Sequence, residues 1–329
     1  MSYGWRDFDP EVVKGIADQY PEHLVKHPDG GMTCPLIGHQ GEWLNWQEGN
    51  YAKGTAPHGS PEATFRVTPT YILSDALDNF IVGRDLISEA MNGSWGKAET
   101  YRLGSENSED ALTFNVFRAL QVAGRLGIVA LLATGSAPKQ EPELFLWGRR
   151  INGDASTDQW DDLARVRLKV EPRHRQQTEP DACLYVHGWG WVLIEAKFAH
   201  GIKTSPNAES MERWLRLYPN FASAIFNLEE IVDVPPDNFA EQILRNMVFA
   251  HLIRGDGEEA AVISLGREKD PTPIAKWLDR CVDLDCPVGF SVNSWEGIYR
   301  ALPADDAALD DLRSYFENKS YSLRSAFAL

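Results

Sequence analysis

The chain has few cysteines, a deficit of basic side chains and no long apolar run. Four cysteines among 329 residues are too few for a disulfide-stapled fold, and their spacing matches no zinc site. Lys and Arg number 32 against 48 Asp and Glu, a formal net charge of -16, which excludes a protein that coats nucleic acid through a generally basic surface. The longest uncharged apolar run, residues 126–134, is less than half the length of a membrane span, and the first residues lack an export signal. These absences predict a soluble, cytoplasmic protein with reduced thiols and no membrane partner.

The composition is otherwise that of a globular protein, but the charge is unevenly distributed. Hydrophobic residues make up 43% of the chain and charged residues 24%, which excludes disordered and collagen-like classes. Residues 1–110 hold 8 basic and 17 acidic side chains, and residues 217–329 hold 10 basic and 19 acidic ones. Residues 145–216, in contrast, are nearly balanced, with 11 basic and 10 acidic side chains. We therefore expect nucleic acid to contact only the middle segment, while the acidic flanks could dock a partner protein.

Hydrophobic patterning divides the chain into an irregular N-terminal lobe of unknown role, residues 1–105, and a regular domain, residues 106–329. In the second part, Ser108 is a good helix N-cap followed by two acids, and apolar residues then recur at near-helical spacing. Strands are predicted at residues 144–150, 164–170, 181–187, 191–198, 260–265 and 288–294, with helices at 210–218, 238–254 and 306–324. This order predicts an α/β fold of the mixed α+β kind, in which helices pack on a mixed sheet.

Two of these strands carry ionisable residues in a pattern suited to phosphodiester hydrolysis. Pro180-Asp181 opens one strand, and Glu195-Ala196-Lys197 lies near the end of the next, after a Gly-Trp-Gly turn. Because side chains alternate along a strand, Glu195 and Lys197 share a face. Carboxylates suit Mg²⁺ or Mn²⁺, and a neighbouring lysine can orient or deprotonate the attacking water. We therefore predict Asp181 and Glu195 as metal ligands and Lys197 as the catalytic lysine, with the Ala196 carbonyl completing the coordination.

This pattern resembles the signature of the PD-(D/E)xK nucleases, the restriction-endonuclease-like superfamily. The resemblance implies an αβββαβ core over about residues 108–266, with residues 267–329 as a C-terminal extension. The segment 239–250 is also similar to a helix of uncharacterised bacterial restriction-like proteins. No such resemblance reaches residues 1–100.

The same resemblance implies a further acidic residue from the first core helix. Glu109 occupies the matching place as a catalytic and metal-binding candidate, with Glu106 and Asp110 as alternatives. Gln242, on the predicted helix 238–254, is a weaker candidate for the site.

A competing interpretation treats Asp181 as a turn residue and Glu195 with Lys197 as part of a solvated strand edge. The segment 192–198 reads VLIEAKF, which is too apolar for an exposed edge. Ionisable groups within such a strand are costly unless they serve a site. We therefore favour the catalytic interpretation.

Basic residues around the motif are candidates for contact with a nucleic acid backbone. The predicted strand 164–170 places three cations on one face, and more follow in the next turn. The candidates are Arg165, Arg167, Lys169, Arg173, Arg175 and Lys203. The alternative is a solvated surface balanced by nearby acids.

Together these features predict a Mg²⁺-dependent or Mn²⁺-dependent endonuclease. The resemblance implies DNA as the substrate and restriction or phage defence as the setting. Cleavage of both strands would favour a homodimer, because one active site addresses one strand. An alternative from another class is a catalytically inactive nuclease-fold module that binds or assembles with a partner in a defence or DNA-processing complex. A third is a hydrolase of small phosphoesters.

Overall fold

A computed structural model of the chain describes two short N-terminal strands and most of residues 76–329. The short strands, β1 (Val25–Lys26) and β2 (Met32–Thr33), pair antiparallel. Beyond residue 76, the residues outside the description are 92–102, 105, 154–155, 172–178, 199–207, 236–237, 271, 273, 284 and 322–323.

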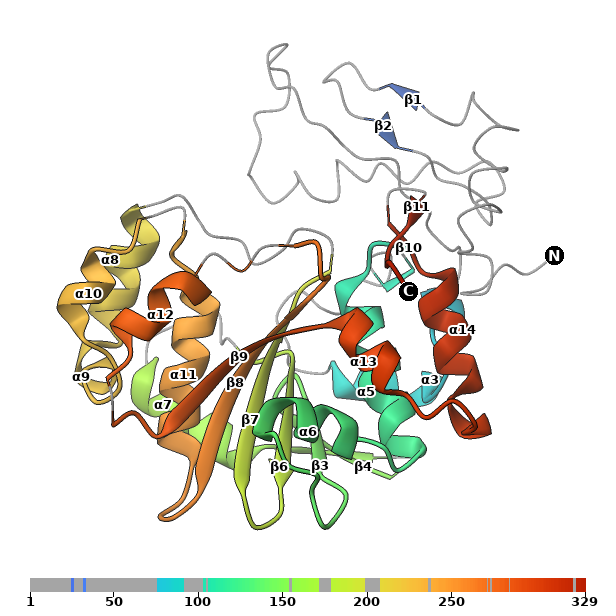
Figure 1. The fold of residues 1–329 in the computed structure, drawn as a ribbon, viewed down its shortest axis with the longest axis horizontal. Coiled ribbons are helices and arrows are strands. Elements are labelled where there is room, and N and C mark those ends of the chain that lie inside the picture. The colour runs from blue at the N-terminus through green and yellow to red at the C-terminus, as the bar shows by residue number, and fades with distance from the viewer. Residues whose placement is uncertain are drawn as a thin grey trace.

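A mixed seven-stranded sheet runs through the domain in the order β5-β4-β3-β6-β7-β8-β9 (Figure 1). Its strands are β3 (Glu143–Leu146), β4 (Arg149–Asn152), β5 (Ser156–Gln159), β6 (Ala182–Val186), β7 (Gly190–Ala196), β8 (Glu259–Gly266) and β9 (Val288–Ser294). Neighbours from β5 to β7 are antiparallel, whereas β8 runs parallel to both β7 and β9. Residues Glu109–Val122 (α5), then β3, β6 and β7, then residues Glu241–Ile253 (α11) and β8 follow the expected αβββαβ order, with further strands and helices inserted between them.

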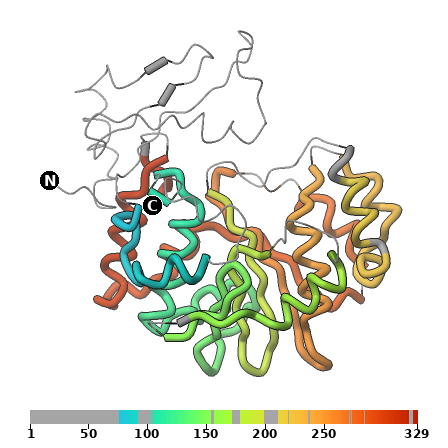
Figure 2. The backbone as a smooth tube through the Cα atoms, turned by 180° about the vertical axis from the view of Figure 1, so that it is seen from behind, coloured from blue at the N-terminus to red at the C-terminus, as the bar shows by residue number. Residues whose placement is uncertain are grey.

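Helices cover both faces of the sheet (Figures 1 and 2). On one face lie η3 (Ala76–Asn79), α3 (Arg84–Ala90), α5 (Glu109–Val122), α6 (Gly127–Thr134), α13 (Trp295–Ala301), η5 (Ala307–Leu309) and α14 (Asp310–Asn318). On the other lie α7 (Asp161–Val170), α8 (Ala208–Leu217), α9 (Pro219–Ala222), α10 (Leu228–Val232), α11 (Glu241–Ile253) and α12 (Ala275–Cys281). Each face of the sheet packs against its helices in a separate hydrophobic core. Side chains along β7 alternate between them: Val192 and Ile194 lie in the core with α5, and Trp191 and Leu193 lie in the core with α11.

Helix α5 begins where the sequence predicts. The Ala111 N–H donates to Ser108 Oγ at 3.1 Å, so Ser108 is a true N-cap. The helix is then buried on all sides from Ala111 to Leu120. Because a helix enclosed in this way cannot shift without disturbing the core, α5 holds Glu109, its first residue, at a fixed place beside the sheet.

The other predicted elements that the structure confirms are those in which apolar residues recur with a clear strand or helix period. The predicted strands at 181–187, 191–198, 260–265 and 288–294 correspond to β6, β7, β8 and β9, and the predicted helices at 210–218 and 238–254 correspond to α8 and α11. The glycine at the predicted hairpin turn, Gly188, has φ +76°, a conformation that favours glycine. At Gly190, an added Cβ would lie 2.0 Å from the Glu259 carbonyl oxygen. This close approach lets β7 pair with β8.

The prediction of a strand at residues 164–170 is wrong. This segment belongs to helix α7, whose first turn contains Asp161 and Asp162 and whose buried positions include Leu163, Val166 and Val170. Those positions follow the helical period once the window begins at residue 161. Leu168, which the strand pattern would bury, is 63% exposed. The expected row of cations along a strand face is therefore absent.

The predicted strand at 144–150 is two strands joined by a tight turn. Trp147 and Gly148 form the loop between β3 and β4, with φ +47° and +78°, as a two-residue hairpin loop requires. Trp147 is unusual at such a position, but its ring stacks against Phe114 of α5 at 6.4 Å. Core packing thus offsets the cost of the backbone conformation.

The predicted helix at 306–324 is also interrupted. It consists of η5, α14 and a small antiparallel hairpin of β10 (Ser320–Tyr321) and β11 (Arg324–Ser325). Phe327 and Tyr321 pack against the Phe198 ring at 5.7 and 5.9 Å. The C-terminal extension therefore covers the end of β7.

Residues 76–91 belong to the same hydrophobic core as α5, although they fall within the segment predicted as the N-terminal lobe. Phe80 packs edge-on against Phe114 at 5.4 Å, and Leu86 and Ile87 are buried in the same cluster. The boundary at residue 105 stays a prediction.

No single helix in the described part of the chain is both long and apolar enough to cross a membrane. The consecutive helices α5 and α6 together have the necessary length and composition, but they are bent by 108° at their junction.

Candidate active site

The two halves of the sequence motif lie side by side at the ends of β6 and β7. Asp181 immediately precedes β6, and its N–H donates to the Ile194 carbonyl oxygen at 3.1 Å. Its side chain then spans to the neighbouring strand, where Oδ2 accepts a hydrogen bond of 2.9 Å from the Ala196 N–H. Antiparallel pairing thus fixes Asp181 against the Glu195-Ala196-Lys197 segment.

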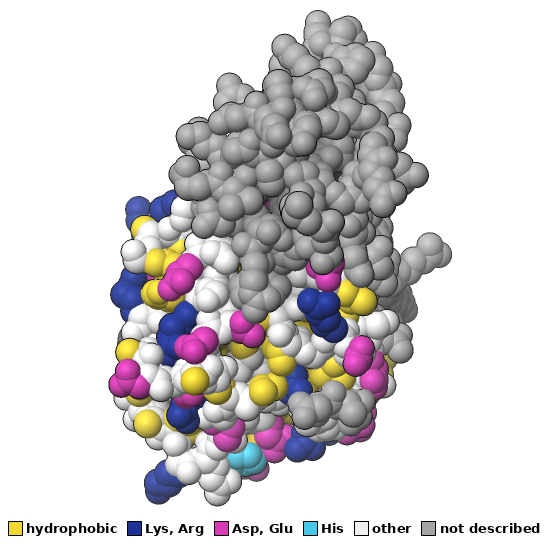
Figure 3. Space-filling view, turned by 90° about the vertical axis from the view of Figure 1, so that its right-hand side faces the viewer, with side chains coloured by type: hydrophobic (Ala, Val, Ile, Leu, Met, Phe, Trp, Pro, Cys, Tyr) yellow, Lys and Arg dark blue, Asp and Glu magenta, His cyan; other side chains and the backbone are white. Residues whose placement is uncertain are grey.

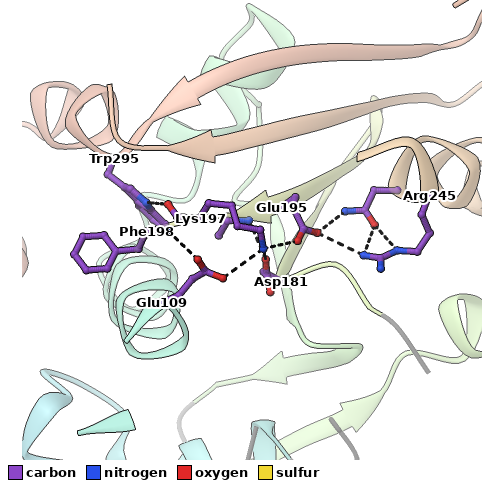
Figure 4. A network of polar contacts seen from close by, with 9 residues as sticks. Glu109, Asp181, Glu195, Lys197, Phe198, Arg245 and Trp295 are labelled. Atoms are coloured by element: carbon purple, nitrogen blue, oxygen red, sulfur yellow. Dashed lines mark hydrogen bonds and ion pairs between the residues drawn. The ribbon is translucent and has the colours of Figure 1, made fainter. Parts of the chain in front are cut away.

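The Lys197 ammonium lies among three carboxylates (Figure 4). Its Nζ is 2.7 Å from Glu195 Oε1, 3.4 Å from Glu109 Oε1 and 3.8 Å from Asp181 Oδ2. Burial lowers the pKa of Lys197, but the three carboxylates outweigh that effect and hold it well above its usual value. The lysine is therefore charged at neutral pH and neutralises part of the cluster.

Glu109 joins the cluster from the first turn of α5. Its Oε2 accepts a hydrogen bond of 2.8 Å from the Phe198 N–H, so the helix is linked to the chain just after β7. Burial raises the pKa of Glu109 to about 7; Lys197 opposes the rise, while Asp181 and Asp110 add to it. Three carboxyl groups thus surround one ammonium, and burial makes the charged form of Glu109 costly.

Glu195 is the most deeply buried of the carboxylates, with 1% exposure. Lys197 contacts Oε1, whereas Oε2 accepts a hydrogen bond of 3.0 Å from Asn246 Nδ2 and lies 3.5 Å from Arg245 Nη2. Both residues belong to α11. A buried carboxylate is stable only when both oxygens have such partners.

The backbone on either side of the motif is equally constrained. The Lys197 N–H donates to the Leu265 carbonyl oxygen of β8 at 2.7 Å, and its own carbonyl accepts a hydrogen bond of 2.9 Å from Trp295 Nε1. Trp295 is fully buried at the start of α13. These contacts fix the point from which the Lys197 side chain extends.

The structure thus brings together the four side chains that the sequence singles out as catalytic: Asp181, Glu195, Lys197 and Glu109. Ala196 lies between two of them and donates its N–H to Asp181; a ligand role for its carbonyl stays a prediction. Of the alternatives to Glu109, Glu106 is buried elsewhere and accepts a hydrogen bond from Ser320 Oγ.

Helix α11 contributes to the site through residues other than the one predicted. Gln242 is half-buried near the start of α11, whereas Arg245 and Asn246 contact Glu195. The sequence patterns described above do not single out these two residues. The signal for them is a pair of adjacent polar residues within the apolar run ILRNMVFA.

The predicted nucleic-acid contacts are dispersed. Arg165 is exposed and pairs with Asp162 at 2.7 Å, and Lys169 lies over the Phe221 ring at 5.3 Å. Arg167 points inward, with 10% of its side chain exposed, and pairs with Glu179 at 3.3 Å. Arg173, Arg175 and Lys203 lie outside the described residues.

Arg167 is buried, so it is not available for the contact with a nucleic acid backbone that the predicted strand implied. Its partner Glu179 stands two residues before Asp181. Arg167 therefore braces the segment that leads into the motif.

The described surface on the right-hand side of Figure 1 is neither mainly basic nor mainly acidic. There, described Lys and Arg side chains alternate with Asp and Glu side chains (Figure 3). This mixing agrees with the exclusion of a generally basic coating protein.

The donor chemistry of the cluster suits a hard divalent cation. Three carboxylates supply the oxygen ligands that Mg²⁺ prefers, and a single ammonium lies among them. In the described ranges, however, no group of three or more His, Cys, Asp or Glu side chains is arranged to hold a metal directly. The carboxylates are held together by Lys197 instead.

The mixed sheet with helices on both faces, and the acidic cluster with its lysine, define a protein of the restriction-endonuclease-like class. A family model described as "Restriction Endonuclease associating with ARP" matches residues 44–320, and the chain belongs to this family. Comparison with curated proteins and with solved structures gave no match.

Proposed function

We propose that the chain is a metal-dependent nuclease of the PD-(D/E)xK type that hydrolyses phosphodiester bonds in DNA. The observation that carries the proposal is the convergence of Glu109, Asp181 and Glu195 on the Lys197 ammonium within 3.8 Å. Membership of a restriction-endonuclease family supports it. Restriction or defence against phage is the setting that this membership favours.

Each residue of the cluster has a distinct role in this proposal. Asp181 and Glu195 would hold Mg²⁺ or Mn²⁺, with Glu109 as a further ligand. The bound metal would polarise the phosphate and activate a water molecule. Lys197, kept charged by its neighbours, would orient the attacking water and offset negative charge that develops on the phosphate.

The charge distribution favours recruitment to DNA rather than independent tight binding. The two arginines of α7 that were candidates for DNA contact, Arg165 and Arg167, each pair with an acidic side chain of the protein. The family description names an association with ARP, so we propose a protein partner that docks on the acidic flanks. A homodimer is the second arrangement that would place two sites on two strands.

The direct test is cleavage of plasmid DNA in the presence of Mg²⁺ or Mn²⁺. Wild-type protein should nick or linearise the plasmid, EDTA should stop the reaction, and added Mn²⁺ should restore it. Asp181→Asn should lose the activity, whereas Asp162→Asn, a matched change at an exposed ion pair on α7, should keep it. Full activity in EDTA would exclude the metal-dependent mechanism.

One observation favours a second candidate, an inactive module that binds a partner. Lys197 already neutralises part of the carboxylate cluster, and the described residues present no ready group of three metal ligands. Calorimetric titration with Mg²⁺ separates the two candidates. A nuclease should bind the ion with an affinity that Glu195→Gln reduces, whereas a binding module should show no such heat.

A further inference from the structure

Helix α11 holds one oxygen of the Glu195 carboxylate and leaves the other facing the cluster. Asn246 Nδ2 donates to Oε2 at 3.0 Å, and Arg245 Nη2 lies 3.5 Å from the same atom. Oε1 is 2.7 Å from Lys197 Nζ. The carboxylate is therefore fixed at both ends and cannot rotate without losing a partner.

Arg245 determines which end of the Asn246 amide meets Glu195. A guanidinium can only donate hydrogen bonds, and Arg245 Nε and Nη2 both donate to Asn246 Oδ1, at 3.3 and 3.1 Å. The amide nitrogen of Asn246 must then point the other way, toward Glu195. Arg245 thus acts on Glu195 directly by charge and indirectly by orienting Asn246.

Packing alone does not account for these two residues. The rest of the buried surface of α11 is apolar, with Ile243, Met247 and Ala250 fully buried in the core. Asn246 is 0% exposed and Arg245 is 5% exposed. An apolar pair would pack there without the desolvation cost of an amide and a guanidinium. Their polar groups instead converge on Glu195.

The convergence is also demanding in its geometry. Adjacent positions on a helix point about 100° apart, so neighbours in sequence do not normally serve one target. Arg245 and Asn246 nevertheless reach the same oxygen of Glu195. The arrangement thus leaves Oε1 for the Lys197 ammonium, while α11 holds Oε2.

We infer that Asn246, oriented by Arg245, is a positioning residue that fixes the Glu195 carboxylate for the reaction. This inference rests on the proposed nuclease function. Groups that orient a ligating carboxylate typically contribute a factor of about 10 to 100 in metal affinity or activity. Gln242, the residue of this helix that the sequence predicts for the site, is not among the partners that the structure shows for Glu195.

The test compares Asn246→Leu, which removes the amide donor at similar volume, with Met247→Leu. Met247 is its neighbour on α11, is fully buried, and lies in the core. Mg²⁺ affinity is measured by calorimetry on the full chain, and kcat and KM are measured on plasmid DNA. We expect Asn246→Leu to lower Mg²⁺ affinity and kcat by about 10-fold to 100-fold with KM unchanged, and Met247→Leu to stay within about twofold.

A second measurement is independent of catalysis. Melting temperatures in EDTA for wild type, Asn246→Leu, Glu195→Gln and the double variant form a double-mutant cycle. We expect the effect of Asn246→Leu to shrink when residue 195 is Gln, because the charged partner is then gone. Should Asn246→Leu fail to fold, Asn246→Ser, whose side chain is too short to reach Glu195, replaces it in both measurements.

The outcomes distinguish the inference from the proposed function. Wild-type protein that neither binds Mg²⁺ nor cleaves DNA overturns the proposed function and the inference with it. Wild-type activity that Glu195→Gln abolishes, but that Asn246→Leu retains at the level of Met247→Leu, overturns the inference alone. Additive melting temperatures in EDTA also contradict it.

Discussion

Replacing Glu109 by Gln should change how the stability of the protein depends on pH. In the folded protein burial raises the pKa of this carboxyl to about 7, from 4.5. The folded protein therefore binds the proton more tightly than the unfolded chain does. Stability contributed by this proton is present below pH 4.5 and is lost as the pH rises through 7. Glutamine does not titrate, so Glu109→Gln removes this dependence.

The size of the effect follows from the two pKa values. One pKa unit corresponds to about 1.4 kcal/mol, so the free energy of unfolding of wild type, relative to Glu109→Gln, should fall by roughly 2 to 3 kcal/mol between pH 5 and pH 8. A Gln at this position can still accept the hydrogen bond from the Phe198 N–H. The charge, and not the backbone contact, is what the substitution changes.

Urea unfolding at pH 5, 6, 7 and 8 in EDTA measures the difference. Thr113→Val, a non-titrating change at a buried position on the same helix, is the control and should differ from wild type by a constant amount. A wild-type advantage over Glu109→Gln that stays constant or grows with pH would refute the reasoning. Mg²⁺ added at pH 8 should favour wild type over Glu109→Gln, because the ion selects the charged carboxylate.

Three further predictions concern the surroundings of the site. Arg167→Met should destabilise the protein by up to about 3 to 5 kcal/mol in urea unfolding, because it removes the guanidinium that pairs with the Glu179 carboxylate; the double variant with Glu179→Gln should recover part of the loss. Trp295→Phe should cost more in the same assay than the roughly 1 kcal/mol of the hydrogen bond to the Lys197 carbonyl, because the smaller ring also leaves a cavity in the core, and it should lower kcat more than KM. Burial raises the pKa of Cys183 well above its usual value, so a thiol reagent at pH 8 should modify it only after denaturant is added.

The sequence was sufficient to predict that the motif side chains converge, because the pattern that places them is local. Asp181, Glu195 and Lys197 lie on two strands joined by a short turn, and period-two alternation determines which side chains share a face. The cap at Ser108 similarly identified the start of α5 and therefore the position of Glu109. Short-range patterns of this kind survive folding when the elements that carry them are buried.

Other parts of the structure depend on contacts that no local pattern records. Residues 164–170 alternate like a strand, but the helix that contains them is set by Leu163, Val166 and Val170 packing on α11. The turn at Trp147 depends on a ring partner on α5. Asn246 and Arg245 acquire a role only because the sheet places Glu195 opposite them. Tertiary packing decides each of these cases.

The central claim is that Asp181, Glu195 and Lys197 form a metal-dependent phosphodiesterase site, and one paired measurement tests it most directly. Plasmid cleavage and Mg²⁺ calorimetry are run on wild type, Glu195→Gln, Lys197→Met and Lys276→Met, the last being an exposed lysine on α12. We predict that Glu195→Gln loses both cleavage and Mg²⁺ affinity. Lys197→Met should lose cleavage but keep Mg²⁺ affinity, because it removes a positive charge from among the carboxylates and leaves the carboxylates themselves in place. Lys276→Met should match wild type. Cleavage that persists unchanged in both Glu195→Gln and Lys197→Met would contradict the claim.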